Sequence, residues 1–236
     1  MPVHLRADPG DYADACLLPG DPVRAQWIAE TFLEGAVPAN AERGLYGYTG
    51  EFEGKRVSVQ ATGMGTPSAA IVIEELAQLG VRRLLRVGTC GAFHPSLSLG
   101  ELVLALSAVP ADGTTRALLD GEPHAPTADW DLLHGLVHAA KELGQPVHVG
   151  PIASSDLFYN PDTSQYGRWA ARGVLAVEME SAVLFTLGAL RGLQAATVLV
   201  VSDELHDERA KRIGDAELRA AVEQMTLLAL RAATGR

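Results

Sequence analysis

Short apolar runs rich in β-branched residues alternate along this chain with longer segments of helical periodicity. Such runs are typical of strands buried on both faces, and their alternation with helices is typical of α/β folds. The strand candidates are residues 15–18, 56–62, 84–87, 101–109, 147–152, 174–177 and 196–201. The helix candidates are residues 22–31, 67–80, 131–144, 164–172, 179–192 and 216–233. The pattern predicts an α/β protein with a mixed sheet covered by helices on both faces.

The composition is that of one globular domain. Apolar residues make up 47% of the chain and charged residues 20%, so a sizeable core fits within a single domain over residues 1–236. The formal net charge of −10 repels nucleic acid and anionic membrane surfaces. We therefore expect neither as a partner, and an anionic ligand would have to be held by a few placed arginines.

Cysteine usage and the N-terminus favour a cytoplasmic protein. Cys16 and Cys90 lie far apart in the sequence and form no CxxC pair, so we expect reduced thiols. The N-terminal residues lack the apolar stretch of a secretory signal. The longest uncharged stretch, residues 57–73, is interrupted by glycine and proline and does not read as a membrane span.

Glycine or polar residues follow several apolar runs directly, and α/β folds bind ligands at such strand ends. After the first run come Gly20 in a tight turn, Pro22 at a helix start and Arg24 one turn in. Backbone N–H groups at a turn like this can hold an anion; a plain turn with a surface arginine is the alternative. A second Gly-rich turn, residues 62–68, lets the backbone approach a ligand, but it is neither a dinucleotide fingerprint nor a Walker A loop.

Arg86 ends a third apolar run. A buried charge at this place is costly unless it has a partner or a ligand. Thr89 adds a hydroxyl and Gly88 leaves the backbone open, a combination that suits phosphate. The alternative is a buried arginine paired with one of the many acids.

Carboxylates follow two further runs. Glu178 and Glu180 flank Met179 between a strand and a buried helix; one of them could serve as a charge at the helix N-terminus, and at least one is placed to bind a polyol such as ribose. Ser202 and Asp203 end the last run. A carboxyl group at a strand end beside an apolar wall can act as a general acid, whereas the alternative is a helix cap or a turn.

These segments together resemble the nucleoside phosphorylase family of the hexameric bacterial purine type, which also contains uridine phosphorylase. The resemblance covers nearly the whole chain. It is carried by seven motifs in order, namely LLPGDPVRA, ERGLYGYTG, GMGTPSAAI, RVGTCGA, SSDLFYNPD, VEMESA and VVSDE. It implies a central mixed, partly barrel-like sheet and the phosphorolysis of purine nucleosides, with no metal and no cofactor and with inorganic phosphate as co-substrate.

The resemblance also implies roles for single residues. The phosphate-binding residues would be Gly20, Arg24, Arg86, Val87, Gly88 and Thr89, with Arg43 reaching the site of the neighbouring subunit. The nucleoside-binding residues would be Phe158, Glu178, Met179, Glu180, Ser202 and Asp203, with His4 crossing from the neighbour to the ribose 5′-hydroxyl. Asp203 would protonate the purine N7. Sites shared in this way imply a homohexamer, a trimer of dimers. His4, Arg43 and Phe158 lie in no motif of their own, and residue type alone would make them surface or packing residues.

Two differences from the family pattern bear on the mechanism. The purine enzymes carry an arginine in the C-terminal helix that bonds the catalytic aspartate, and here Leu218 occupies that position. Arg209, Arg212 or Arg219 could substitute, or none. The uridine branch has Gln and Arg where this chain has Asp162 and Ser164, which favours purines. A hydrolase or a nucleoside-binding protein of the same fold are the remaining alternatives; neither needs both the arginines and Asp203.

Overall fold

The computed structural model describes residues 2–205 and 211–235. Ten strands form one mixed sheet in the order β10-β9-β6-β7-β8-β5-β1-β4-β3-β2. The strands are β1 Ala15–Leu18, β2 Glu34–Asn40, β3 Gly47–Phe52, β4 Lys55–Gln60, β5 Arg83–Ala92, β6 Leu102–Ala111, β7 Val147–Ser155, β8 Ala176–Glu178, β9 Gln194–Glu204 and β10 Lys211–Arg212. The helices are α1 Pro22–Phe32, the 3-10 turn η1 Glu42–Gly44, α2 Thr66–Gln78, α3 Gly113–Leu118, α4 Trp130–Glu142, α5 Ser164–Ala170, α6 Ser181–Arg191 and α7 Asp215–Thr234.

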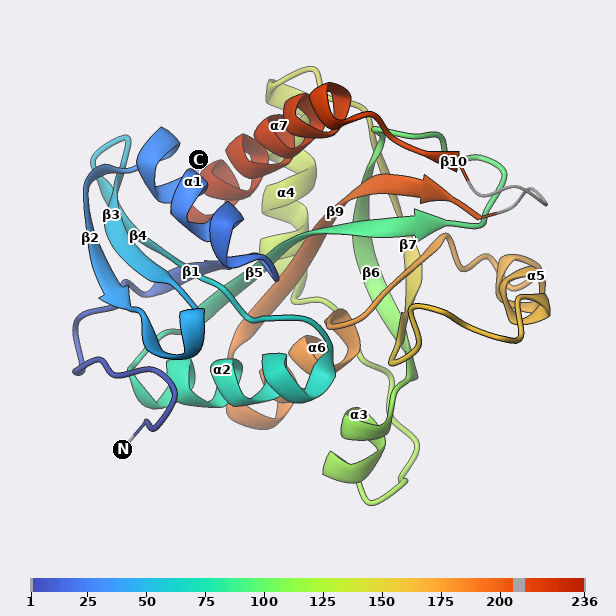
Figure 1. Ribbon diagram of the computed structural model, residues 1–236, viewed down its shortest axis with the longest axis horizontal. Coiled ribbons are helices and arrows are strands. Elements are labelled where there is room, and N and C mark those ends of the chain that lie inside the picture. The colour runs from blue at the N-terminus through green and yellow to red at the C-terminus, as the bar shows by residue number, and fades with distance from the viewer. Residues whose placement is uncertain (1, 206–210, 236) are drawn as a thin grey trace.

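Part of the sheet closes on itself. Strand β5 pairs with β9 as well as with β8, so β5, β9, β6, β7 and β8 form a ring (Figure 1). Strand β1 joins β5 to β4, and β4 leads to the antiparallel strands β3 and β2. The predicted mixed, partly barrel-like sheet is therefore confirmed.

Helices cover both faces of the sheet, as the sequence predicts. Helices α1, α4 and α7 pack on one face, where Ile28, Leu136 and Leu228 are fully buried. Helices α2 and α6 pack on the other, with Leu76 and Leu184 in a second buried cluster (Figure 1). Within the described part of the chain, no helix is both long and apolar enough to cross a membrane.

Local signals in the sequence set the helix starts that matter for the site. Asp21 accepts a hydrogen bond from the Val23 N–H and caps α1, and Pro22 occupies the first turn. Helix α2 starts after Gly65, whose φ of 84° lies in the left-handed region that favours glycine. Both helices therefore begin directly above a strand end.

The structure corrects several predicted boundaries. The helix expected over residues 179–192 is Ser181–Arg191, so Glu180 lies in front of it. Strands β2 and β3 are absent from the prediction. The edge strand β2 is largely exposed and contains Pro38, and β3 contains Gly47 and Gly50, so neither has an apolar run to recognise. The sequence also did not predict the short elements α3 and β10.

Candidate active site

Two of the predicted ligand-binding turns lie side by side. The Thr62 N–H donates to the Pro19 carbonyl oxygen at 2.9 Å, which joins the turn after β4 to the turn after β1. Gly20 approaches Gly63 so closely that a Cβ on Gly20 would stand 3.1 Å from the Gly63 carbonyl oxygen. A side chain at position 20 would crowd this contact, so glycine is favoured here by space and not by backbone angle.

Arg24 lies in the first turn of α1, just after the turn that contains Gly20. Burial lowers the pKa of Arg24, the nearby Asp21 carboxylate opposes this effect, and the guanidinium of Arg86 adds to it. Two arginine side chains therefore lie close enough to repel each other. Among the described residues, the Arg24 side chain has no hydrogen bond or ion pair, which leaves its donors open to an anion.

Arg86 is the centre of a buried ion-pair network. Its Nε donates to Glu178 Oε2 at 2.6 Å, and its Nη2 lies 2.5 Å from Glu180 Oε2. Burial alone would lower the pKa of Arg86, but the carboxylates of Glu180 and Glu178 outweigh it and raise that pKa. The sequence allowed Arg86 to be either a partner of acids or a ligand for phosphate, and the structure permits both. Its Nε and Nη2 pair with the two acids, whereas its Nη1 is bonded to neither of them.

Glu178 has all of its bonding capacity engaged by the protein. Its carboxylate accepts hydrogen bonds from the N–H groups of Glu180 and Ser181 and from the Ser154 hydroxyl, in addition to Arg86. Glu178 is therefore the acid that places a negative charge at the N-terminus of α6, which was one of the two roles that the sequence allowed. Its predicted contact with a nucleoside stays a prediction.

Glu180 is the second acid of the pair and stands at the N-cap of α6. Its Oε1 accepts from the Gly65 N–H at 2.5 Å, and its side chain is buried. Burial raises the pKa of Glu180, the Arg86 guanidinium opposes this, and the Glu178 carboxylate adds to it. Glu180 thus connects the turn before α2 to the arginine, while Met179 beside it is half-buried.

The backbone after Arg86 is shaped for close approach. A Cβ on Gly88 would stand 2.8 Å from Arg86 Nη2 and 3.2 Å from Nη1, so the guanidinium lies directly over this glycine. Val87 is fully buried and anchors the strand, and Thr89 is partly exposed further along it. The predicted phosphate residues of β5 therefore surround the same guanidinium.

A β-bulge positions Ser202 and Asp203. In the pairing of β5 with β9, Cys90 faces Val201 but Gly91 faces Asp203, so Ser202 is the extra residue. Bulges bend a strand and re-aim its side chains, and they are frequent at functional sites. The Ser202 hydroxyl donates to Asp203 Oδ2 at 2.7 Å. Since β9 continues through Asp203, the alternative that this residue caps a helix is wrong.

Cys90 shows that Asp203 and the Arg86 network are neighbours. Burial raises the pKa of the Cys90 thiol, the Glu178 carboxylate adds to it, Arg86 opposes it, and Asp203 adds a further increase. The thiol therefore interacts electrostatically with Glu178, Arg86 and Asp203. Seven predicted residues, drawn from four separate strand ends, meet around this point: Gly20, Arg24, Arg86, Gly88, Glu178, Glu180 and Asp203.

Three predicted residues form no hydrogen bond or ion pair with this group among the described residues of the single chain. The backbone and ring N–H groups of His4 are held by Glu75 of α2, with Nδ1 2.9 Å from Oε1. Arg43 is exposed in η1, with a φ of 55°. Phe158 is 64% exposed and packs edge-on against Tyr159. Their predicted roles at the site stay predictions.

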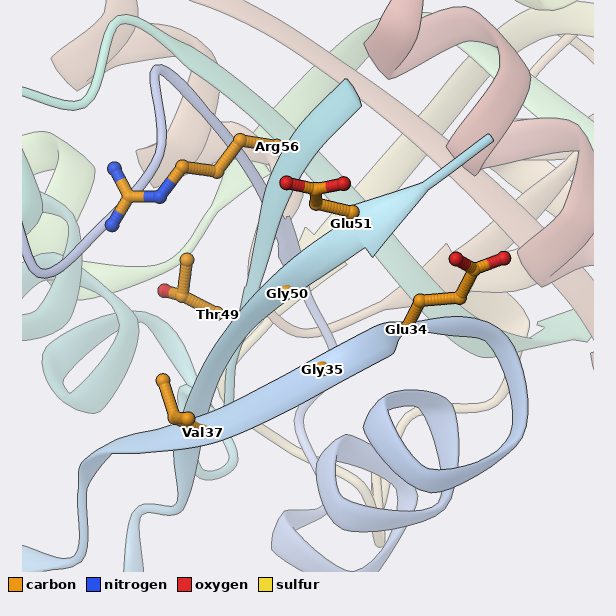
Figure 2. A pocket seen from close by; sticks show the side chains of 7 residues that line it. All are labelled: Glu34, Gly35, Val37, Thr49, Gly50, Glu51 and Arg56. Carbon is orange, nitrogen blue, oxygen red and sulfur yellow. The ribbon is translucent and has the colours of Figure 1, made fainter. Parts of the chain in front are cut away.

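The hollow shown in Figure 2 lies elsewhere, over β2 and β3. It measures about 330 Å³, and its lining includes Glu34, Glu51 and Arg56. The Arg56 guanidinium is engaged by the carbonyl oxygens of Gly10, Asp11 and Tyr12. With its arginine engaged and two carboxylates at its rim, this hollow suits no phosphate, and none of the predicted site residues lines it.

Comparison with known proteins identifies the family. Residues 14–234 match the model of the phosphorylase superfamily. The chain belongs to the phosphorylase superfamily. Among its relatives, the DeoD-type purine nucleoside phosphorylase of Geobacillus kaustophilus is 48% identical over 206 residues, which is 87% of each chain. The protein of the same name from Caldanaerobacter subterraneus is 47% identical over 206 residues, covering 87% of this chain and 89% of its own.

Some residues of this phosphorylase-superfamily site are not evident from sequence reasoning. The Gly65 N–H and the Ser154 hydroxyl hold Glu180 and Glu178, respectively, yet Gly65 has no side chain and Ser154 is one of many serines in the sequence. Their positions inside GMGTPSAAI and SSDLFYNPD were the available signal. In the described part of the chain, no group of three or more His, Cys, Asp or Glu side chains could hold a metal ion.

Proposed function

We propose that this protein is a purine nucleoside phosphorylase, which splits purine ribonucleosides and deoxyribonucleosides with inorganic phosphate into the free base and the pentose 1-phosphate. One observation carries the proposal: Arg86 is ion-paired with the buried carboxylate of Glu180 and interacts electrostatically with Arg24, while Asp203 stands on the neighbouring strand β9, paired with Gly91 of β5. This reaction needs an anion site, a polyol site and an acid that lie close together. Relatives at 47–48% identity that carry this enzyme's name support it.

Phosphate would bind over Gly20, Gly88 and Thr89, between the two arginines. Arg24 offers open donors, and Arg86 is held in one orientation by Glu178 and Glu180. A guanidinium fixed in this way loses little side-chain entropy when it binds an anion bidentately. The chain as a whole carries a net charge of −10, so this local pair has to supply the attraction.

Glu180 would accept hydrogen bonds from the ribose 2′- and 3′-hydroxyls, with Met179 beneath the sugar. Ser202, Asp203 and Phe158 would face the purine. The His4 ring is held by Glu75 and Arg43 is exposed, and among the described residues neither side chain is bonded to the group of its own chain, which supports their delivery from a neighbouring subunit. The proposed assembly is a homohexamer arranged as a trimer of dimers. The free cysteines Cys16 and Cys90 are compatible with the cytoplasm.

The reaction follows from these positions. The C1′–N9 bond breaks through a cation-like sugar, and its electron pair goes to the purine. Asp203 gives its proton to N7, so the base leaves neutral, and a phosphate oxygen bonds to C1′. Placing the phosphate beforehand supplies about 7–11 kcal/mol in ideal cases, and a general acid typically contributes about 10²–10⁴-fold. Asp203 then takes back a proton from solvent, to which the phosphate ester releases its own.

Product analysis tests the proposal. The protein is incubated with inosine, adenosine, guanosine and uridine, each with and without phosphate, and free base is measured. We expect base from the purine nucleosides only, and only with phosphate. Release without phosphate would indicate a hydrolase, release from uridine alone would indicate a uridine phosphorylase, and no release would indicate a binding protein.

Substitution of the acid tests its role in the same assay. Asp203→Ala should lower turnover of inosine about 10²–10⁴-fold, because N7 protonation is lost, while the dissociation constant of phosphate changes little. Wild-type turnover in Asp203→Ala would contradict the role of Asp203 but not the phosphorylase activity.

A further inference from the structure

The short strand β10 places a cation opposite Asp203. In the antiparallel pairing of β10 with β9, Arg212 is the direct register partner of Asp203. Side chains at paired positions lie on one face of a sheet within reach of each other. Arg212 Nη1 lies 3.3 Å from Asp203 Oδ1, and the Ser202 hydroxyl donates to the other oxygen, Oδ2. Each carboxylate oxygen of Asp203 therefore has its own donor.

The backbone fixes this arrangement as well as the side chains. The Ile213 N–H donates to the Ser202 carbonyl oxygen at 2.9 Å, and the Ile213 side chain is buried. Lys211 faces Glu204 one position along, with Nζ 3.6 Å from Oε2. In this register two neighbouring cross-strand charge pairs form, and one of them joins Arg212 to Asp203.

Other arginines that the sequence offers do not meet Asp203 in the structure. Leu218 packs against the core at the helix position where the family has its arginine. Arg219 is exposed on α7 and has no contact with Asp203. Arg209 lies outside the described residues. Of the cations that the structure describes, Arg212 is the one within ion-pair distance of Asp203.

We propose that Arg212 is the positioning residue for Asp203, supplied here by a strand and not by the C-terminal helix. This inference rests on the proposed function, in which the Asp203 proton moves to N7. The contact strengthens during that step, because a guanidinium attracts a carboxylate more than a neutral carboxyl group. An interaction that strengthens toward the transition state raises turnover and not only binding.

The expected size of the effect is modest. The Arg212 side chain is 68% exposed, and exposed ion pairs contribute little to the resting protein. Removal of the guanidinium removes one hydrogen bond to a charged group, and solvent weakens that bond. We therefore expect turnover to fall about tenfold. Stability and phosphate binding should be nearly unchanged, because Arg212 contacts neither the core nor the Arg86 network.

The test separates acid positioning from a structural role by changing the leaving group. Arg212→Met and Arg212→Lys are compared with wild type and with the matched control Arg219→Met. The substrates are guanosine and 7-methylguanosine, whose base already carries a positive charge at N7 and needs no proton there. Turnover and the KM for phosphate are measured for each.

We expect Arg212→Met to lose about tenfold in kcat on guanosine with an unchanged KM for phosphate, to retain wild-type kcat on 7-methylguanosine, and to be partly rescued in Arg212→Lys. Arg219→Met should equal wild type. Equal losses on both nucleosides, no loss at all, or a loss confined to Arg219→Met would overturn the role of Arg212. Failure of wild type to cleave either nucleoside would instead overturn the proposed function.

Discussion

Glu180 Oε2 lies 2.5 Å from Arg86 Nη2, and both side chains are buried. A pair of this kind contributes less to stability than its distance suggests, because both charges are removed from water. The ion pair matters because it fixes the positions of the two side chains. It joins the residue proposed to hold the sugar to the residue proposed to hold the phosphate, so the two substrates would bind to one rigid unit.

Glu180→Gln should separate substrates by their hydroxyl groups. A neutral amide is a weaker acceptor than a carboxylate, so kcat/KM for inosine should fall about 10- to 100-fold. The loss should be smaller for 2′-deoxyinosine, which offers one hydroxyl fewer. Steady-state kinetics with both nucleosides checks this, and Glu223→Gln on the exposed face of α7 is the control. Equal losses for both substrates would argue against hydroxyl recognition by Glu180.

Gly88→Ala should weaken phosphate binding selectively. The new methyl group would stand 2.8 Å from Arg86 Nη2 and push the guanidinium off the backbone. We expect the KM for phosphate to rise about tenfold, a typical loss for one charged hydrogen bond, with a smaller change in the KM for inosine. Gly167→Ala is a fair control, since nothing lies within 4 Å of its Cβ. An unchanged KM for phosphate would show that Arg86 does not bind it from this position.

The parts of the fold that the sequence predicts well are those with an unambiguous pattern. Strand β1 is found at its predicted bounds, and the helices of both faces lie within a few residues of theirs. Strand β2 escapes prediction, because a largely exposed edge strand interrupted by proline has no apolar signal. Family membership required the ordered motifs, since no single turn was specific.

Within the site, the sequence predicts residue types better than their division of labour. Glu178 and Glu180 are chemically alike and two positions apart. Which of them accepts hydrogen bonds from the N–H groups at the start of α6 depends on where that helix begins, and it begins at Ser181. The bulge at Ser202 and the pairing of Asp203 with Arg212 depend on register, which is set by tertiary packing. The roles of His4 and Arg43 require a second subunit, and these two roles and that of Phe158 stay predictions.

Ser154→Ala should destabilise the protein and loosen the site. The Ser154 hydroxyl donates to Glu178 and accepts from the Ala182 N–H at 2.8 Å, so its loss leaves a buried N–H without a partner. We expect a decrease of about 1–3 kcal/mol in the free energy of unfolding, measured by urea denaturation. Ser155→Ala, which removes an acceptor for the Leu157 N–H, should cost less. A larger effect of Ser155→Ala would contradict the importance of the Glu178 network.

The attachment of the N-terminal segment should depend on pH through Glu75. Burial alone would raise the pKa of Glu75, but hydrogen bonds from the His4 ring and from the N–H groups of Val3, Leu5 and His4 outweigh it and lower that pKa. A carboxyl group with a lowered folded-state pKa binds fewer protons when folded. Its stabilisation is complete above the unfolded pKa of about 4.3 and is lost as pH falls through the folded value.

Glu75→Gln tests this linkage, because the amide cannot gain or lose the proton. We expect the variant to be about 1–3 kcal/mol less stable than wild type at pH 7, with the difference shrinking as pH falls below about 4.3. Urea denaturation across this pH range at one protein concentration measures it. Glu74→Gln serves as the control, since its ion pair with Arg191 is exposed to solvent and should contribute little to stability at any pH. A difference between wild type and Glu75→Gln that stays constant with pH, or grows on acidification, would show that Glu75 does not hold the segment through its charge.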